Sequence, residues 1–282
     1  MDIQNSTPAL QCLQWFGETD RGKVRANNED AFLGLQFDSQ EVHYLGKHGE
    51  ASTRDLDFVF AVSDGMGGAQ AGEFASRIAV EKITTLLPRA FRQVAVGLPG
   101  GPDDILTELF NEIHEALTYV GGSYSECVGM EATLSLCWFT PRWMYFAHIG
   151  DSRIYYLPAH SRELKRLSQD DTHVDWLFRT GQINEREARS HPRRNVLQKA
   201  LGGDNQFVDP QLGAVAYSAG DTFLICSDGL VDGLYDGQIL DVLRRPESAA
   251  VGINPAHCLV REALEKDGRD NITALVVQLG GA

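Results

Sequence analysis

A short apolar run that ends on a carboxylate and several glycines constrains this chain more than any other feature. Residues 58–62 are aromatic, β-branched or small and apolar, which predicts a buried strand. The strand leads into Ser63-Asp64-Gly65-Met66-Gly67-Gly68, and residues 69–87 have the spacing of an amphipathic helix. A strand that delivers an acid to a turn without side chains can hold a metal ion against backbone carbonyls. The alternative is an ordinary glycine turn whose acid caps the helix.

Composition excludes several classes of function. The chain has 282 residues and is 43% hydrophobic, so it can bury one large core. Its formal net charge of −14 argues against a nucleic-acid-binding face, which needs clustered Lys and Arg. The 5 cysteines are scattered and have no CxxC spacing, which argues against a disulfide framework and a zinc site. The absence of a signal-peptide pattern and of any run of about 18 apolar residues predicts a cytoplasmic protein that spans no membrane.

The order of the predicted elements favours packed sheets covered by helices. We find no internal repeat and no long linker, so residues 1–282 are expected to form one domain with a core of about 12–279. Residues 38–57 are expected to form a hairpin or a surface insertion, and Gly121-Gly122 is expected to end the second helix. Strands are expected at residues 12–18, 31–35, 58–62, 132–139, 143–149, 153–157, 208–217, 222–226 and 271–279. Helices are expected at residues 69–87, with a kinked continuation towards 94 as an option at Pro88, and at 106–120, 174–180, 185–190, 196–201, 238–243 and 255–266.

Acids stand at five junctions where a strand meets a turn. Each acid alone is more often a turn or cap residue, but five such junctions are harder to explain as independent caps. If the acids converge, cations must neutralise their repulsion, and an oxygen-only ligand set selects Mg²⁺ or Mn²⁺. Two such ions about 3.5–4 Å apart can generate hydroxide and neutralise a phosphoryl oxygen. The junctions are Glu29-Asp30, Asp64-Gly65, Gly150-Asp151, Asp228-Gly229 and Asp270-Asn271.

Arg25 lies five residues before Asp30 and is the candidate phosphate ligand. A guanidinium offers a planar fork to two phosphate oxygens. The alternative is a surface ion pair with Glu29 or Asp30.

Taken in order, these motifs resemble those of the protein phosphatase 2C (PPM) family, and the bacterial form is the closer match. The resemblance runs from about residue 12 to 279. It implies an α+β fold, a four-layer αββα sandwich of two mostly antiparallel sheets flanked by pairs of helices, with a metal centre at one end. The motifs are Arg25-Ala26-Asn27-Asn28-Glu29-Asp30, Ser63-Asp64-Gly65-Met66-Gly67-Gly68, His148-Ile149-Gly150-Asp151-Ser152-Arg153, Cys226-Ser227-Asp228-Gly229-Leu230 and Asp270-Asn271-Ile272-Thr273.

The resemblance also implies a chemistry and assigns residues to it. The activity would be Mn²⁺- or Mg²⁺-dependent hydrolysis of phosphoserine and phosphothreonine in proteins, by one-step attack of a metal-bridging hydroxide. Asp64 would bridge the two metals and the Gly65 carbonyl would bind one of them. Asp228 and Asp270 would hold the first metal. Asp30 would act on the second metal, and Arg25 would hold the phosphate.

Further residues match peripheral parts of the family's site. Asp151 and Asp232 match acids linked to a weaker third metal, and Glu29 and Asn271 are added candidates because they adjoin two of the acids. Residues 171–195 resemble the mobile flap beside the site. Between Arg179 and Lys199 there are six Lys/Arg and two acids, a local charge of +4 that fits recruitment of an anionic phosphoprotein.

The chain departs from the family pattern at three places. Met66 and Ala69 stand where relatives often have His, and Glu131-Ala132-Thr133 replaces Gly-Thr-Thr. The first two changes remove the obvious general acid for the leaving alkoxide. A water molecule would have to protonate it, or a histidine from elsewhere; the candidates are His43, His148, His173 and His191.

The leading hypothesis is a free-standing, monomeric phosphatase that opposes a bacterial Hanks-type kinase and acts on phosphorylated proteins. A pseudophosphatase that binds phosphoproteins without turnover is the alternative from a different class. A regulatory phosphatase with one dedicated substrate and a hydrolase of small phosphorylated metabolites share the same chemistry.

Overall fold

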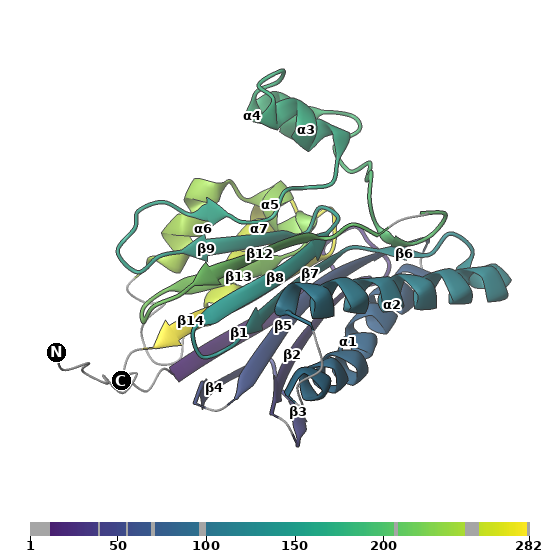
Figure 1. Cartoon of the computed structure of the whole chain (residues 1–282). Helices are drawn as coiled ribbons and strands as arrows, with labels where there is room; N and C mark the ends of the chain where they lie inside the picture. The colour runs from purple at the N-terminus through teal and green to yellow at the C-terminus, as the bar shows by residue number, and fades with distance from the viewer. Residues whose placement is uncertain are drawn as a thin grey trace.

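Two antiparallel β-sheets lie face to face, with helices against both outer surfaces (Figure 1). The structure is a computed structural model that describes residues 12–38, 40–54, 56–68, 71–95, 100–205, 208–245 and 254–280. One sheet has six strands in the order β10 (Lys165–Arg166), β9 (Arg153–Leu157), β13 (Thr222–Cys226), β14 (Ile272–Gly280), β1 (Cys12–Asp20), β4 (His48–Ser52).

The second sheet has eight strands. Its main path runs β11 (Leu201–Gly202), β6 (Glu131–Ala132), β5 (Asp57–Met66), β7 (Leu134–Phe139), β8 (Trp143–Ile149), β12 (Gln211–Ala216). Off this path, β2 (Asp30–Phe37) pairs with β5, and β3 (Val42–Tyr44) pairs with β2.

Helices cover each sheet on its outer surface. The helices α1 (Ala71–Ala95) and α2 (Pro102–Ser123), followed by the short 3₁₀ turn η1 (Ser125–Cys127), pack on the eight-stranded sheet. The helices α5 (Asp228–Gly233), α6 (Asp236–Leu243) and α7 (Pro255–Lys266) pack on the six-stranded sheet. The helices α3 (His173–Arg179) and α4 (Glu185–Ser190) belong to the predicted flap and stand off from both sheets in Figure 1. The predicted α+β sandwich is therefore confirmed.

Strand periodicity explains why each central strand is buried on both faces. In β5, Phe58, Phe60 and Val62 point into the layer between the sheets, whereas Val59 and Ala61 pack under α1 and α2. The strands β13 and β14 divide their side chains between the inter-sheet layer and the helices α5–α7 in the same way. Continuous apolar runs in the sequence therefore mark strands covered from both sides.

The structure corrects several details of the expected elements. Residues 196–201 are not helical, because Leu197 bridges to Thr172 and the chain enters β11, where Gly202 has φ +86°. Residues 38–57 contain two short strands that join different sheets, since β3 pairs with β2 and β4 pairs with β1. The helix α2 runs through Gly121-Gly122 to Ser123. The optional continuation of the first helix past Pro88 is confirmed, since α1 runs to Ala95. The strand β12 is shorter than the predicted 208–217.

The prediction that residues 1–282 form one domain stays a prediction. No helix in the described ranges is both long and apolar enough to cross a membrane.

Candidate metal centre

The predicted acids gather at one end of the sandwich, where strands of both sheets begin or end. Asp30 opens β2 and lies directly across from Asp64 near the end of β5. A cleft at this end is lined by Arg25, Glu29, Asp64, Gly65, Met66, Asp151, Asn195, Asp228 and Asp270, among others. The structure therefore brings together, at one cleft, acids that are up to about 240 residues apart in the sequence.

The backbone of Asp64 is fixed by Thr133. The Thr133 hydroxyl accepts from the Asp64 amide at 3.0 Å, and the Thr133 amide donates to the Asp64 carbonyl at 2.8 Å. The Thr133 hydroxyl also shares a hydrogen bond of 2.8 Å with Ser152, next to Asp151. Thr133, the residue of the departing Glu131-Ala132-Thr133 segment that matches the family pattern, therefore holds the backbone of Asp64.

Two hydroxyls from the opposite sheet hold one oxygen of Asp30. Ser227 Oγ and Thr273 Oγ1 donate to Asp30 Oδ2 at 2.7 and 2.6 Å, while Asp30 Oδ1 is buried and has no hydrogen-bond partner. Burial raises the pKa of Asp30 to about 6, although both hydroxyls act to lower it. One carboxylate oxygen is thus used to join the sheets, and the other is left for a ligand.

Gly65 lies against the start of α1. A Cβ on Gly65 would sit 1.8 Å from the Gly72 carbonyl oxygen, so no side chain fits there. The Gly65 amide donates to the Glu29 carbonyl at 3.1 Å, and the Gly65 carbonyl projects to the same side of the strand. The Glu29 carboxylate lies beside Gly72, and burial raises its pKa.

Arg25 is paired with Asp270. Arg25 Nη2 lies 2.6 Å from Asp270 Oδ2, and the Asp270 Oδ1 atom accepts from the Asn271 amide at 2.8 Å. The Asn271 side chain instead organises the loop before β2, since it donates to the Arg21 and Asn27 carbonyls and accepts from the Glu29 amide. Asn271 therefore has a structural role in shaping the Arg25 loop.

Like charges crowd the centre of the cleft. Burial raises the pKa of Asp64 well above its usual range, and Asp30, Asp228, Asp151 and Asp270 raise it further. The pKa of Asp228 is raised in the same way, first by burial and then by its acidic neighbours. Burial raises the pKa of Asp151 to about 7. Without cations, this end of the sandwich retains protons that ordinary carboxyl groups have lost.

The donor set fits hard divalent cations. Among the described residues, no three His, Cys, Asp or Glu side chains are already drawn together as a finished ligand set. Two buried carboxylate oxygens, Asp30 Oδ1 and Asp228 Oδ1, have no hydrogen-bond partner. Buried polar atoms are almost always paired, so these two oxygens indicate a place for cations.

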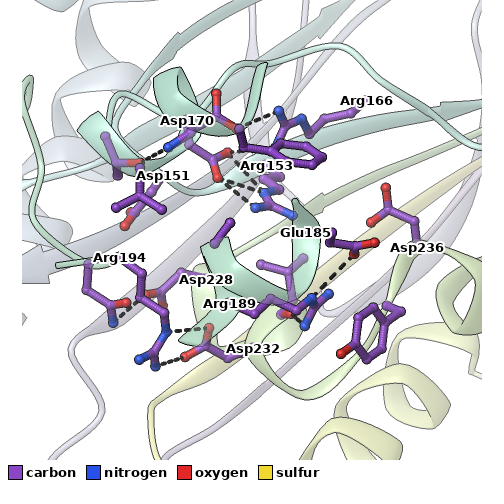
Figure 2. A pocket seen from close by; sticks show the side chains of 18 of the residues that line it. Asp151, Arg153, Arg166, Asp170, Glu185, Arg189, Arg194, Asp228, Asp232 and Asp236 are labelled. Carbon is purple, nitrogen blue, oxygen red and sulfur yellow. Dashed lines mark hydrogen bonds and ion pairs between the residues drawn. The ribbon is translucent and has the colours of Figure 1, made fainter. Parts of the chain in front are cut away.

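The flap forms a second pocket beside this cleft, against α5 and α6 (Figure 2). Arg194 Nη2 lies 2.7 Å from Asp232 Oδ2, and Asn195 donates to Asp228 at 3.4 Å. Arg189 donates to the Val231 and Leu234 carbonyls and lies 3.7 Å from the centre of the Tyr235 ring. The flap arginines therefore attach the flap to α5, and Asp232 is paired with one of them.

The cleft brings no obvious proton donor. None of the described residues that line it is His, and Met66 is one of its walls. His148 is fully buried beneath the Asp151 turn, and His173 stacks on Trp176 in the flap. Ala69 lies outside the described residues. The sequence did not identify the supporting roles of Thr133, Ser227 and Thr273, because single Ser and Thr residues at or near strand ends have no distinguishing spacing.

Comparisons with known proteins give the same assignment as the motifs. Residues 47–267 match the family model described as protein phosphatase 2C. The serine/threonine protein phosphatase PstP of Mycobacterium tuberculosis is 34% identical over 270 residues, which cover 95% of this chain and 45% of PstP. The chain thus spans less than half the length of that relative. The serine/threonine phosphatase stp of Listeria welshimeri is 32% identical over 263 residues, covering 92% of this chain and 93% of the relative.

A solved structure of one of these relatives is also similar to this chain. The catalytic domain of PstP in complex with two manganese ions superposes with a TM-score of 0.74 at 32% identity, covering 96% of this chain and 99% of that one. These relatives carry the name serine/threonine phosphatase or serine/threonine protein phosphatase. This chain belongs to the protein phosphatase 2C family.

Proposed function

We propose that this chain is a metal-dependent phosphatase that hydrolyses phosphoserine and phosphothreonine monoesters in proteins, opposing a Hanks-type kinase. The observation that carries the proposal is the pair of buried, unpartnered oxygens on Asp30 and Asp228. Asp228 lines the cleft that Arg25 also borders, and Asp30 lies directly across the strand pair from Asp64, another residue of that cleft. Such oxygens need a cation, and Arg25 supplies a fork suited to phosphate.

Within this proposal, the acids of the cleft divide the cations among them. Asp64, the Gly65 carbonyl, Asp228, Asp270 and Asp30 would hold two Mn²⁺ or Mg²⁺ ions, with Asp64 shared between them. Asp270 is paired with Arg25 in the structure, so binding an ion would release the guanidinium for phosphate. Asp151 and Asp232 are the candidates for a weaker third ion, and Asp232 would have to leave Arg194 to bind it.

The chemistry follows from what the cleft contains. The bound cations would supply an activated water molecule and neutralise charge on the phosphoryl oxygens. The described residues that line the cleft include no Ser, Cys or His nucleophile, and in this proposal the aspartates would be occupied by cations, which favours direct attack by water. Arg25 orients the phosphate. The leaving alkoxide takes its proton from water, because no described side chain of the cleft matches the histidine found in relatives.

The test compares p-nitrophenyl phosphate and a phosphothreonine peptide in Mn²⁺, with and without EDTA. We expect hydrolysis of both in Mn²⁺ and none in excess EDTA, and we expect Arg25→Ala to lower kcat/KM by about 100-fold. Activity that persists in EDTA would contradict the proposal. Tight binding of the phosphopeptide without turnover in Mn²⁺ would identify a phosphoprotein-binding regulator of the same fold.

A further inference from the structure

We propose that His148 is a positioning residue, which fixes the turn that carries Asp151 and ties that turn to the base of the flap. The inference rests on the proposed function, because both the turn and the flap border the candidate metal centre. His148 does not line the cleft and touches no reacting group.

His148 is fully buried on β8, on the inter-sheet side of the strand. Its Nδ1 atom lies 2.8 Å from Ser135 Oγ on the neighbouring strand β7, and its Nε2 atom lies 3.1 Å from the Gly150 carbonyl oxygen. A carbonyl only accepts, so Nε2 carries the proton and Nδ1 accepts from the Ser135 hydroxyl. Burial lowers the pKa of His148 to about 4, so the imidazole is neutral and this single tautomer persists.

The Gly150 carbonyl is shared between two donors. Besides His148 Nε2, it accepts from the Asp171 amide at 2.7 Å, while the Gly150 amide donates to Asp171 Oδ2 at 3.0 Å. Gly150 has φ +108°, and a Cβ there would lie 2.5 Å from Thr133 Cγ2. Both polar groups of the residue that precedes Asp151 are therefore fastened to the chain at Asp171.

Asp171 is also the base of the flap. Its carbonyl accepts from the Gln198 amide at 2.7 Å, and the adjacent Thr172 bridges to Leu197. The flap neck, residues 171–172 and 197–198, is thus closed at the same residue that holds Gly150. His148 contacts the Gly150 carbonyl from β8. The cross-strand partner of His148 on β12 is Gln211, which donates to the Gln169 carbonyl.

The consequence is that the Asp151 turn and the flap neck share one support. Without a donor at the position of His148 Nε2, the Gly150 carbonyl keeps only the Asp171 amide and loses its buried anchor. The turn and the neck then loosen together, although neither Asp64 nor Asp30 has lost a contact. Supporting residues of this kind orient a site without touching its ligand.

The experiment uses two substitutions that separate the ring nitrogens. His148→Gln keeps an amide donor near the position of Nε2. His148→Asn replaces only the Nδ1 position, so the Gly150 carbonyl keeps the Asp171 amide as a donor and loses the side-chain donor. Hydrogen exchange is measured on the Mn²⁺-loaded full chain. We expect the Asp171 and Gln198 amides to exchange about tenfold faster in His148→Asn and within about threefold of wild type in His148→Gln.

Kinetics give a second readout. For the phosphothreonine peptide we expect kcat/KM to fall about tenfold in His148→Asn, mostly through KM, with recovery in His148→Gln. Ser135→Ala is the matched control, because it removes the contact at Nδ1 and leaves the Gly150 carbonyl bonded. Its flap-neck exchange should match that of wild type.

Equal exchange at Asp171 in His148→Asn and His148→Gln would overturn the inference, as would a drop in Tm in both without any change at the flap neck. Exchange needs no turnover, so it reads the positioning role even if the wild-type chain proves inactive. An inactive wild type with the expected exchange pattern would therefore count against the phosphatase proposal alone.

Discussion

The cleft and the flap pocket share a wall formed by Asp151, Asn195 and Asp228. Asp170 in the flap pocket and Asp64 in the cleft nevertheless have pKa values shifted in opposite directions. In the flap pocket, Asp170 receives a bidentate Arg153, whose Nη2 lies 2.7 Å away, and its pKa stays lowered in spite of burial (Figure 2). In the cleft, Asp64 and Asp228 face other carboxylates, and burial raises their pKa values. Asp170, which is paired with an arginine, stabilises the folded chain, whereas Asp64 and Asp228 remain available to bind cations.

The difference between the acids of the cleft and Asp170 of the flap pocket is tested most strongly by neutralising Asp64. We expect Asp64→Asn to lower kcat in Mn²⁺ by about 1000-fold, because the bridge between the cations is lost. In EDTA the same variant should unfold at a higher temperature than wild type, because one source of repulsion is gone. Phosphatase assays of the variant and the wild type measure the fall in kcat, and thermal unfolding of both proteins in EDTA measures the rise in unfolding temperature. A variant that is inactive and also less stable in EDTA would show that Asp64 supports the fold rather than a metal.

The matched change in the flap pocket, at Asp170, should destabilise the metal-free chain, whereas Asp64→Asn should stabilise it. We expect Asp170→Asn to lower the free energy of unfolding by about 3 kcal/mol in EDTA and in Mn²⁺ alike, because Arg153 is left without its carboxylate partner. Urea denaturation measures the loss. Replacing Arg153 and Asp170 together, as Arg153→Met with Asp170→Leu, should recover much of it. If Asp170→Asn stabilises the metal-free chain as Asp64→Asn does, the two pockets do not differ in the way described.

The metal-free chain should become more stable as the pH falls. The pKa values of Asp30 and Asp151, about 6 and about 7, lie above the ordinary Asp value, so the folded state binds protons that the unfolded state has released. Their contribution is complete below about pH 4 and is lost as the pH rises through 6 and 7. Each such proton changes the free energy of unfolding by about 1.4 kcal/mol per pH unit within that window.

Denaturation curves in EDTA between pH 5 and 8 measure this slope. In saturating Mn²⁺ the trend should flatten or reverse, since ligand carboxylates must be deprotonated. A metal-free chain whose stability rises with pH over that range would contradict the assignment of the raised pKa values.

The smallest expected effect concerns the hydroxyls behind Asp30. Ser227→Ala removes one of the two donors to Asp30 Oδ2, so the carboxylate is held less firmly and ionises less readily. We expect the Mn²⁺ concentration for half-maximal activity to rise about tenfold with little change in kcat at saturation. Thr140→Ala, a hydroxyl in the β7–β8 turn away from the cleft, is the control and should leave the Mn²⁺ requirement unchanged. A fall in kcat at saturating Mn²⁺ would show that Ser227 acts on more than ligand placement.

The sequence predicted the strands and the acids at their ends well, because both depend on local patterns. The apolar runs before Asp64 and Asp228 predicted buried strands, and both runs are strands. The turn expected at each Asp-Gly pair was wrong, because Asp64-Gly65 lies inside β5 and Asp228-Gly229 begins α5. The helix predicted at 196–201 was wrong because its apolar residues serve a bridge to Thr172 and the short strand β11, pairings that link distant segments. Helix propensity carries no information about such partners.

The hydrogen bonds that support the site could not be predicted from the sequence, because they also link distant segments of the chain. Ser227 and Thr273 reach Asp30 from across the sandwich, and the Gly150 turn is completed by Asp171. These contacts depend on how the two sheets align and where the flap begins, and no spacing along the chain encodes either. The prediction that positive charge on the flap recruits phosphoproteins stays a prediction. In the structure, Arg179, Arg189, Arg194 and Lys199 already contact carboxylates of the same chain.

The contact between Gly65 and Gly72 bears on how this site can evolve. A Cβ at Gly65 would meet the Gly72 carbonyl at 1.8 Å, and one at Gly72 would meet the Gly65 carbonyl at 2.7 Å, so substitution at either would force the strand and helix apart. Met66 between them has a side chain on the cleft wall and no such restriction. A lineage, or a randomised library, can therefore vary residue 66 while both glycines stay invariant. A histidine at position 66 is accessible to this chain by changing one residue, with the backbone that holds the acids left as it is.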